Sequence, residues 1–207
     1  MSSDYRFTTP LSEQDILPLR VGDSVTLDGL VWGIRDATLI HMFDRGNVPP
    51  VDLRGGVLLH TAPNVKKVGA SYEPICVGTT TSIRMDRFTE GLLRDYGVRG
   101  IIGKAGLSAR SAELMRQYPA VYLAIVGGAA SVETLQIEEI EAVYWEELMP
   151  ECLWQFRVRG LGPLTVGIDP LGHNLHLDVT ARARDRLDEI HASLGIRAVS
   201  NQQSGDG

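Results

Sequence analysis

The chain has 207 residues, a length that can bury a sizeable hydrophobic core and that favours one domain, expected here over residues 1–198. Its 20 Lys and Arg residues against 26 Asp and Glu residues give a net charge of −6, and no basic run forms the stripe that nucleic acid or an anionic lipid surface would require. No apolar run approaches the roughly 18 residues of a membrane span, and the start "MSSDYRFTTPLSEQD" lacks the basic and apolar regions of a signal peptide, so we expect a cytoplasmic protein.

The first predicted elements lie between residues 24 and 63. "SVTLDGLVWGIR" predicts a β-hairpin, because Asp28-Gly29 suits a tight turn and apolar residues lie on both sides, which places Arg35 at the far end of the second strand. "DATLIHMFDRG" predicts a helix with Asp36 as its N-terminal cap and Gly46 as its stop. "GGVLLHTAP" predicts a further short strand.

The middle of the chain repeats one unit of strand, loop and helix. It reads first as strand "PICV", loop "GTTTS" and helix "MDRFTEGLLRDYG", and then as strand "GII", loop "GKAGLS" and helix "ARSAELMRQY". A third strand, "AVYLAIV", follows. Strands that alternate with helices indicate parallel βα units, so the fold class is α/β.

The last third predicts a mainly β portion followed by a helix. "IEEIEAVYW", "LWQFRVRG" and "GPLTVGID" have few breakers inside and turn residues between them, which is typical of strands. Residues 179–194 predict a helix with an apolar face of Ala183, Leu187, Ile190 and Leu194. Residues 199–207 are expected to be a disordered tail because their composition cannot bury anything.

Two loops carry the side chains that suggest a ligand site. "GTTTSIR" and "GKAG" fall at the carboxyl ends of predicted parallel strands, where open sheets bind ligands, so Thr80, Thr81, Arg84 and Lys104 could converge. Hydroxyls, backbone amides and cations together suit an anion, and a small carboxylate fits better than a phosphate because neither loop has a phosphate-binding motif. Each residue also has a structural interpretation: a helix cap for the threonines, an ion pair for Arg84 and a solvated charge for Lys104.

The histidines and cysteines give weaker signals. His41 lies in an apolar helix pattern and His60 at a strand end, and we interpret both as structural because neither has a partner nearby in sequence. Cys76 and Cys152 are too far apart in sequence for a local metal or redox motif, and each is expected to be a small buried hydrophobe.

The order of several segments resembles a known family. "RVGD", "RDA", "YEPICVGTTTSIRMD", "GIIGKAG", "QIEEIEAVYWEEL", "MPECLWQFRV" and "GPLTVGIDPLGHNL" are similar to the β subunit, or C-terminal domain, of the iron-sulfur class I fumarate hydratases and L(+)-tartrate dehydratases. The resemblance implies a swivelling β/β/α domain that closes over a 4Fe-4S cluster held by three cysteines of a separate α subunit. It also implies a heterotetramer of two α and two β chains. No metal ligand is implied in this chain.

The resemblance also implies roles for individual residues. The first threonine of the family's G-P-T-T-x-x-R-M motif is the proposed base, which gives Thr80 here, and Thr81 is its hydrogen-bonding neighbour. Arg84, Lys104 and Arg35 correspond to the residues that bind substrate carboxylates or stabilise charge. The iron would act as a Lewis acid on the departing hydroxyl, and a carboxylate of the α subunit would take or share the proton of the threonine.

Several positions depart from the family pattern. Thr79 stands where proline is usual, Leu39 where histidine is expected, and Ala105 and Ala62 where glycine is common. The implied function is that of a hydro-lyase β subunit acting on a small dicarboxylic acid such as fumarate, malate or tartrate, with specificity left open. The alternative is a non-catalytic carboxylate-binding or regulatory module that kept the fold.

Overall fold

The computed structural model describes residues 2–125 and 130–195. The chain divides into two compact units, Met1–Leu175 and His176–Gly207. The single domain expected over residues 1–198 stays a prediction, and the expected disordered tail at residues 199–207 lies outside the described residues.

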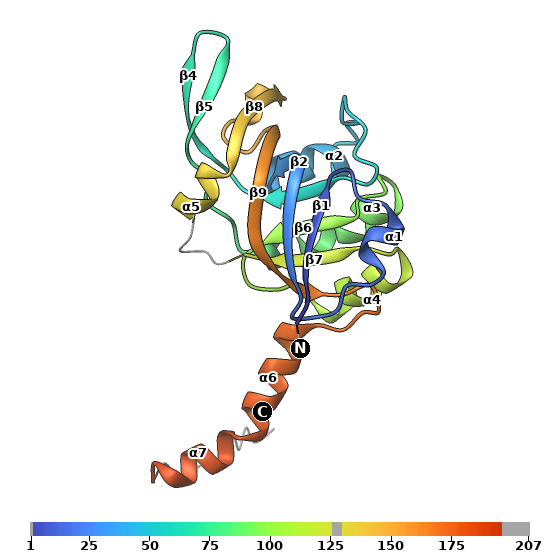
Figure 1. Cartoon of the computed structure of the whole chain (residues 1–207), viewed down its shortest axis with the longest axis vertical. Coiled ribbons are helices and arrows are strands. Elements are labelled where there is room, and N and C mark those ends of the chain that lie inside the picture. Colours follow the sequence, from blue (N-terminus) through green and yellow to red (C-terminus); the bar gives the residue numbers. More distant parts are fainter. Residues whose placement is uncertain (1, 126–129, 196–207) are drawn as a thin grey trace, which may run out of the picture. The chain divides into compact units, whose positions relative to one another are not determined.

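The larger unit is a mixed α/β structure built on a seven-stranded sheet (Figure 1). The strand order is β1 (Asp4–Thr8), β2 (Ser24–Ile34), β3 (Val57–His60), β6 (Gly100–Gly103), β7 (Val121–Ala124), β9 (Leu153–Ile168) and β8 (Ile137–Tyr144). Strands β2, β3, β6 and β7 run parallel to one another. Strand β9 is antiparallel to both β7 and β2, so the sheet closes on itself.

Helices cover one face of this sheet and connect its parallel strands. Figure 1 shows α2 (Asp36–Phe43), α3 (Thr89–Arg94) and α4 (Ala109–Gln117) on the same side, and the 3-10 helix η1 (Ser82–Phe88) leads into α3. The described residues of this unit also include the short helices α1 (Glu13–Ile16), α5 (Ala130–Leu135) and η3 (Glu146–Leu148). The sheet therefore has an outer face for the helices and an enclosed inner face.

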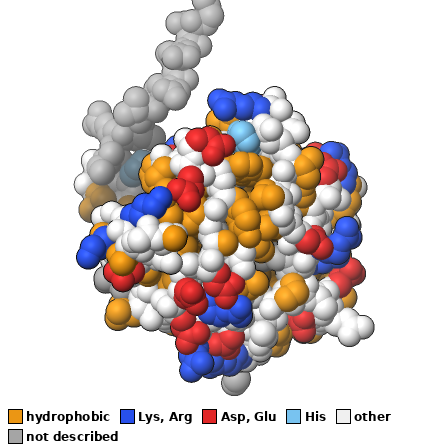
Figure 2. Space-filling view, turned by 90° about the horizontal axis from the view of Figure 1, so that it is seen from above, with side chains coloured by type: hydrophobic (Ala, Val, Ile, Leu, Met, Phe, Trp, Pro, Cys, Tyr) orange, Lys and Arg blue, Asp and Glu red, His pale blue; other side chains and the backbone are white. Residues whose placement is uncertain are grey.

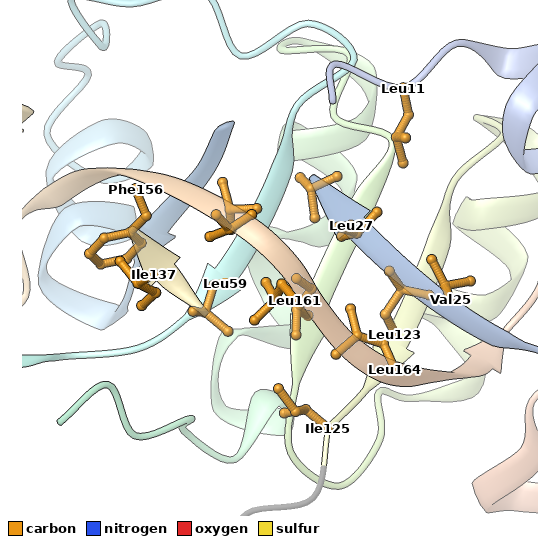
Figure 3. Packing of buried hydrophobic residues seen from close by; sticks show 14 of the residues in the cluster. Leu11, Val25, Leu27, Leu59, Leu123, Ile125, Ile137, Phe156, Leu161 and Leu164 are labelled. Atoms are coloured by element: carbon orange, nitrogen blue, oxygen red, sulfur yellow. The ribbon is translucent and has the colours of Figure 1, made fainter. Parts of the chain in front are cut away.

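The core has two parts because side chains alternate across each strand. Leu59 and Ile102 belong to the cluster on the inner face of the closed sheet, part of which Figure 3 shows. Leu58 and Ile101, the residues directly before them, belong to the cluster beneath the helices. Both faces of these strands are buried, as expected of parallel strands.

The hairpin predicted at Asp28-Gly29 is wrong. Strand β2 runs without a break through both residues and pairs with β1 on one side and β9 on the other. Gly29 has a positive φ of 103°, and a Cβ on it would lie 2.7 Å from Thr9 Oγ1. Gly29 therefore allows an irregular strand to pass close to the Thr9 backbone and does not form a turn. Asp28 forms an ion pair with Arg6.

The strand predicted at "PICV" does not belong to the main sheet. Strand β5 (Ser71–Cys76) pairs antiparallel with β4 (Asn64–Val68) in a separate two-stranded sheet, which projects from the body in Figure 1. This hairpin interrupts the connection from β3 to β6. The helix predicted over "MDRFTEGLLRDYG" is η1 followed by α3.

The second repeat is confirmed as β6, α4 and β7, although residue 126 of the predicted third strand lies outside the described residues. The mainly β portion is confirmed as β8 and β9. The two strands predicted at "LWQFRVRG" and "GPLTVGID" are wrong as separate elements, because the 16-residue β9 includes both. Pairing with β2 carries β9 through Gly160 and Gly162.

The predicted helix over residues 179–194 is divided in two. Helix α6 spans Leu175–Asp185 and α7 spans Leu187–Ser193, with Arg186 between them. The apolar residues Leu187, Ile190 and Leu194 are 47%, 40% and 66% exposed. Among the helices in the described ranges, none has the length and apolar character needed to cross a membrane.

Candidate functional site

The candidate site lies at the carboxyl ends of three neighbouring parallel strands. Arg35 follows β2, Thr61 follows β3 and Lys104 follows β6. Because β2, β3 and β6 are adjacent and parallel, these residues come to one edge of the sheet.

The threonine loop, residues 79–81, crosses this edge and is held by backbone hydrogen bonds. Thr80 N donates to His60 O at 2.7 Å, and Lys104 N donates to Thr80 O at 3.3 Å. Ser82 N in turn donates to Lys104 O at 3.1 Å, and Thr81 forms a parallel bridge with Lys104. The loop reaches the predicted edge although it follows a hairpin strand and not a parallel one.

The side chains of Thr80, Thr81 and Lys104 are all half-buried. Within the described ranges, the Thr80 and Thr81 hydroxyls and the Lys104 ammonium make no hydrogen bond or ion pair with another residue. These groups therefore remain available to a ligand or to a second chain.

The two arginines meet on one carboxylate. Arg84 Nη2 lies 2.8 Å from Asp36 Oδ2, and Arg35 Nε lies 3.1 Å from the same oxygen. Arg84 does pair with an acidic residue, as its structural interpretation allowed, but the partner comes from α2 and not from its own helix. The Arg84 side chain is 52% exposed, so the pair contributes about 0–1 kcal/mol and leaves the arginine able to exchange partners.

A second carboxylate, missed by the sequence analysis, anchors Arg35. Glu151 Oε1 lies 3.3 Å from Arg35 Nε, and Glu151 Oε2 accepts a hydrogen bond from Ala37 N at 2.8 Å. Glu151 thus places negative charge at the N-terminus of α2, where the helix dipole favours it. The predicted cap Asp36 is wrong, because Arg35 occupies the cap position and makes no side-chain cap bond. The segment "MPECLW" was noted as a motif, but nothing local assigned Glu151 to this site.

A buried polar cluster lies beneath the loop. His60 Nδ1 is 2.9 Å from Ser82 Oγ, and Tyr122 OH donates to the same oxygen at 3.0 Å. All three side chains are buried, and burial lowers the pKa of His60 to about 4 while the Asp36 carboxylate opposes that shift. His60 is buried as a structural histidine should be. Its partners Ser82 and Tyr122 are 22 and 62 residues away in sequence, so no local pattern indicated them.

Asp86 and His41 both have structural partners. The carboxylate of Asp86, the last residue of "GTTTSIRMD", accepts hydrogen bonds from Ser108 N, Ser108 Oγ and Ser111 Oγ and so fixes the start of α4. His41 packs against Trp145 with the two rings tilted at 58° and their centroids 4.7 Å apart.

The residues that differ from the family pattern lie in different surroundings. Thr79 is buried, and its hydroxyl has no partner among the described residues. Ala105 has a positive φ of 62°, a conformation that glycine adopts at lower cost. Leu39 is fully buried in the cluster beneath the helices, so this position belongs to the core.

The residues that the structure describes contain no group of three His, Cys, Asp or Glu side chains that could hold a metal ion. Cys152 is buried as expected, and burial raises the pKa of its thiol to about 11, which disfavours the thiolate that binds metals. Cys76 is only half-buried on β5, contrary to expectation. An iron-sulfur cluster does not fit the cysteines of this chain.

The surface around the loop includes exposed apolar side chains. Ile75 on β5 and Ile83 on η1 flank the loop in sequence and are 57% and 50% exposed. Figure 2 views the molecule from the side on which the β4–β5 hairpin projects and shows hydrophobic side chains gathered in the middle of that face, with charged side chains around them.

Comparison with known proteins identifies relatives over most of the chain. The model of the family described as Fumarase C-terminus matches residues 4–179. The L(+)-tartrate dehydratase subunit beta of Escherichia coli is 36% identical over 184 residues, which cover 88% of this chain and 92% of that protein. A putative L(+)-tartrate dehydratase subunit beta of Methanocaldococcus jannaschii is 32% identical and is covered to 98% of its length, with 90% of this chain aligned. A putative fumarate hydratase class I of Geobacillus stearothermophilus is 32% identical over 87% of this chain, which spans only 35% of that protein.

Proposed function

Because the chain belongs to the fumarase C-terminus family, we propose that it is the β subunit of a heteromeric, iron-sulfur-dependent hydro-lyase that adds water to, or removes it from, a small dicarboxylic acid. In this proposal the larger unit acts as a swivelling β/β/α domain that closes over the partner's 4Fe-4S cluster. The enzyme would be cytoplasmic and active only as a complex, for which we propose two α and two β chains.

One observation carries this proposal more than any other. The threonine loop is hydrogen-bonded to the ends of β3 and β6 so that Thr80 and Lys104 share a backbone hydrogen bond, while Arg35 and Arg84 meet at Asp36 on the same edge. A hydroxyl and three cations at one edge match what a dicarboxylate needs: fixed positive charge for its carboxylates and a group beside its acidic C–H bond.

The proposed chemistry assigns a part to each side chain. Thr80 takes the proton next to a substrate carboxylate, which converts that carboxylate into an aci-carboxylate dianion, and Arg35, Arg84 and Lys104 stabilise the added charge. Thr81 donates a hydrogen bond beside the base. Since a neutral threonine hydroxyl is a poor base, Thr80 Oγ1 must give up its own proton as it takes the substrate proton, and we propose a carboxylate of the α subunit as the acceptor. The cluster held by that subunit would supply the Lewis acid for the departing hydroxide.

Two features of the described residues support the proposal of a separate α subunit. The described residues offer no ligand set for a cluster, and the proposed base has no hydrogen-bonded acceptor in the described part of the chain. A partner that covers the half-buried threonine loop would contribute both groups and exclude water, which strengthens the electrostatic effect of the cations.

The first experiment tests the complex. The chain is co-expressed with an α subunit that carries three cluster cysteines and is encoded beside it, purified without oxygen, and assayed with fumarate, mesaconate, malate and tartrate. Hydratase or dehydratase activity with one of these acids supports the proposal. A stable complex that binds the acids without turning them over would favour the non-catalytic carboxylate-binding module, and absence of any such partner would refute the proposal.

The second experiment tests the base. Thr80→Val should reduce kcat by at least about 100-fold while the complex still assembles, because proton transfer by a positioned group contributes factors of this size. Thr26→Val is the matched control, since Thr26 is also half-buried but lies on β2 opposite Arg6 of β1. Near-normal turnover by Thr80→Val would remove Thr80 from the mechanism.

The third experiment tests the cations. Lys104→Met should lower kcat/KM by about 10-fold or more, as expected for loss of a charged hydrogen bond of about 1.5–3 kcal/mol. Lys66→Met on the exposed β4 strand is the control for loss of a lysine charge. An unchanged kcat/KM for Lys104→Met would exclude Lys104 from the site.

A further inference from the structure

Three side chains from different elements meet beneath the threonine loop. His60 comes from the end of β3, Ser82 from the start of η1 and Tyr122 from β7, and their exposed fractions are 1%, 0% and 0%. The Ser82 hydroxyl is the centre of this cluster, 2.9 Å from His60 Nδ1 and 3.0 Å from Tyr122 OH. A Cβ added to Gly103 would lie 1.8 Å from Ser82 Oγ, so the glycine makes room for the hydroxyl.

The order of the hydrogen bonds follows from the number of protons available. Tyr122 donates to Ser82 Oγ, and a serine hydroxyl has one proton of its own to donate. His60 Nδ1 is the remaining partner of Ser82 Oγ among the described residues, so the arrangement that gives this buried proton an acceptor has Nδ1 as the unprotonated ring nitrogen. The neutral ring carries its proton on Nε2, a buried atom with no partner among the described residues.

The charges around His60 agree with a neutral ring. Burial lowers its pKa to about 4, and the Asp36 carboxylate on α2 is the charged group that opposes this shift. On the other side, β7 and η1 present the neutral hydroxyls of Tyr122 and Ser82. A protonated Nδ1 could not accept the Ser82 proton and could only donate to Ser82 Oγ, so charging His60 would reverse this hydrogen bond.

Ser82 connects this cluster to the groups of the proposed reaction. It follows the threonine loop directly, and its amide donates to Lys104 O, while Thr80 N donates to the carbonyl of His60 itself. A shift of Ser82 or His60 would therefore move Thr80 and Lys104 relative to each other. Misplacement of reacting groups by about 1 Å can cost on the order of 100-fold in rate.

We propose that His60, Ser82 and Tyr122 form a positioning cluster that holds Thr80 and Lys104 in register, with His60 as the neutral Nε2–H tautomer. The catalytic consequence rests on the proposed function, whereas the tautomer and the rigidity of the loop do not. The experiments below separate the two.

The tautomer is tested by nitrogen NMR of the full chain labelled in its 5 histidines. The His60 signals are identified by their loss in His60→Gln. We expect the shift pattern of an Nε2–H tautomer that does not titrate between pH 8 and about pH 5, where an ordinary histidine would already be charged. An Nδ1–H pattern, or titration near pH 6.5, would overturn the assignment.

The positioning role is tested by amide hydrogen exchange and by kinetics. Ser82→Ala should speed exchange at the Thr80 and Ser82 amides, and in the active complex it should lower kcat by about 10- to 100-fold with a smaller change in KM. Ser111→Ala is the matched control, because Ser111 is a fully buried serine whose hydroxyl bonds to Asp86 and Thr89 instead. Tyr122→Phe should give a milder loss, since the bond between Ser82 and His60 remains.

The outcomes distinguish the two proposals. If the wild-type complex has no hydro-lyase activity, the proposed function fails, while the exchange and NMR results still decide the cluster. If the complex is active and Ser82→Ala matches Ser111→Ala in both exchange and kcat, the positioning role is refuted.

Discussion

Replacing Gly103 by alanine should disable the candidate site from within the sheet. The new Cβ would lie 1.8 Å from Ser82 Oγ, which must retreat by roughly 1.6 Å before the contact reaches the 3.4 Å of ordinary packing. That movement breaks the two hydrogen bonds of Ser82 with His60 and Tyr122, at about 1 kcal/mol each, and adds about 1–3 kcal/mol of overpacking. We expect unfolding in urea to show a loss of about 3–5 kcal/mol, with a melting temperature lower by about 10 °C.

Two comparisons make this prediction specific. In Gly100→Ala, at the other end of β6, the nearest atom to the new Cβ is in the Val57 side chain at 3.1 Å, and the change should cost about 1 kcal/mol. Adding Ser82→Gly to Gly103→Ala removes the atoms that clash and should restore much of the stability. Turnover of the complex should stay low, because the hydroxyl is gone. If Gly103→Ala is no worse than Gly100→Ala, or if the second change restores activity, the reasoning about the Ser82 hydroxyl is refuted.

Three further predictions concern stability. Gly29→Ala should lower the free energy of unfolding in urea by about 3 kcal/mol, because the new Cβ would meet Thr9 Oγ1 at 2.7 Å. Gly22→Ala is the control: its φ is also positive, at 89°, but the new Cβ has open space, so it should lose clearly less stability. Equal losses would contradict the role of the Thr9 contact. Ala105→Gly should gain about 0.5–1 kcal/mol by relieving a φ of 62° at an exposed site, and a loss would show that the strain is absent. Burial raises the pKa of Glu133 from 4.5 to about 7, so the stability that its protonated carboxyl contributes to the fold is full below pH 4.5 and is lost as pH rises through 7. Glu133→Gln should therefore flatten the dependence of the unfolding free energy on pH between these values. An unchanged curve would contradict the raised pKa.

The elements that the sequence predicted correctly are those fixed by local pattern. Strand β6, helix α4 and strand β7 follow from apolar runs and a helical repeat bounded by turn residues. Asp28-Gly29 misled because its turn preference is real in isolation, whereas pairing of β2 on both sides keeps the strand continuous. "PICV" misled for a related reason: its apolar residues suit any strand, and only the pairing with β4 decides to which sheet it belongs.

The same division applies to the candidate site. The sequence predicts Thr80 and Lys104 at one edge because each lies in a loop after a predicted parallel strand. Lys104 does follow the parallel strand β6, whereas the threonine loop follows the β4–β5 hairpin and reaches the edge through its backbone hydrogen bonds. Glu151 and Tyr122 could not be placed, because each reaches the site across a separation that no local pattern encodes. Glu151 acts on Arg35 from a loop after β8, and Tyr122 reaches Ser82 from two strands away in sequence.

The charges at the site explain why a second chain suits the proposed chemistry. Arg35, Arg84 and Lys104 bring three positive charges to the edge, but Asp36 and Glu151 already balance two of them. A dicarboxylate with two negative charges would therefore leave the edge with an excess of negative charge, and removal of a proton from the substrate would increase it. Positive charge near the substrate must then come from elsewhere, or Asp36 must release Arg84, whose half-exposed side chain makes that exchange cheap. In the proposed complex the missing positive charge would have to come from side chains of the partner subunit, so the same partner that closes the site would also complete its electrostatics.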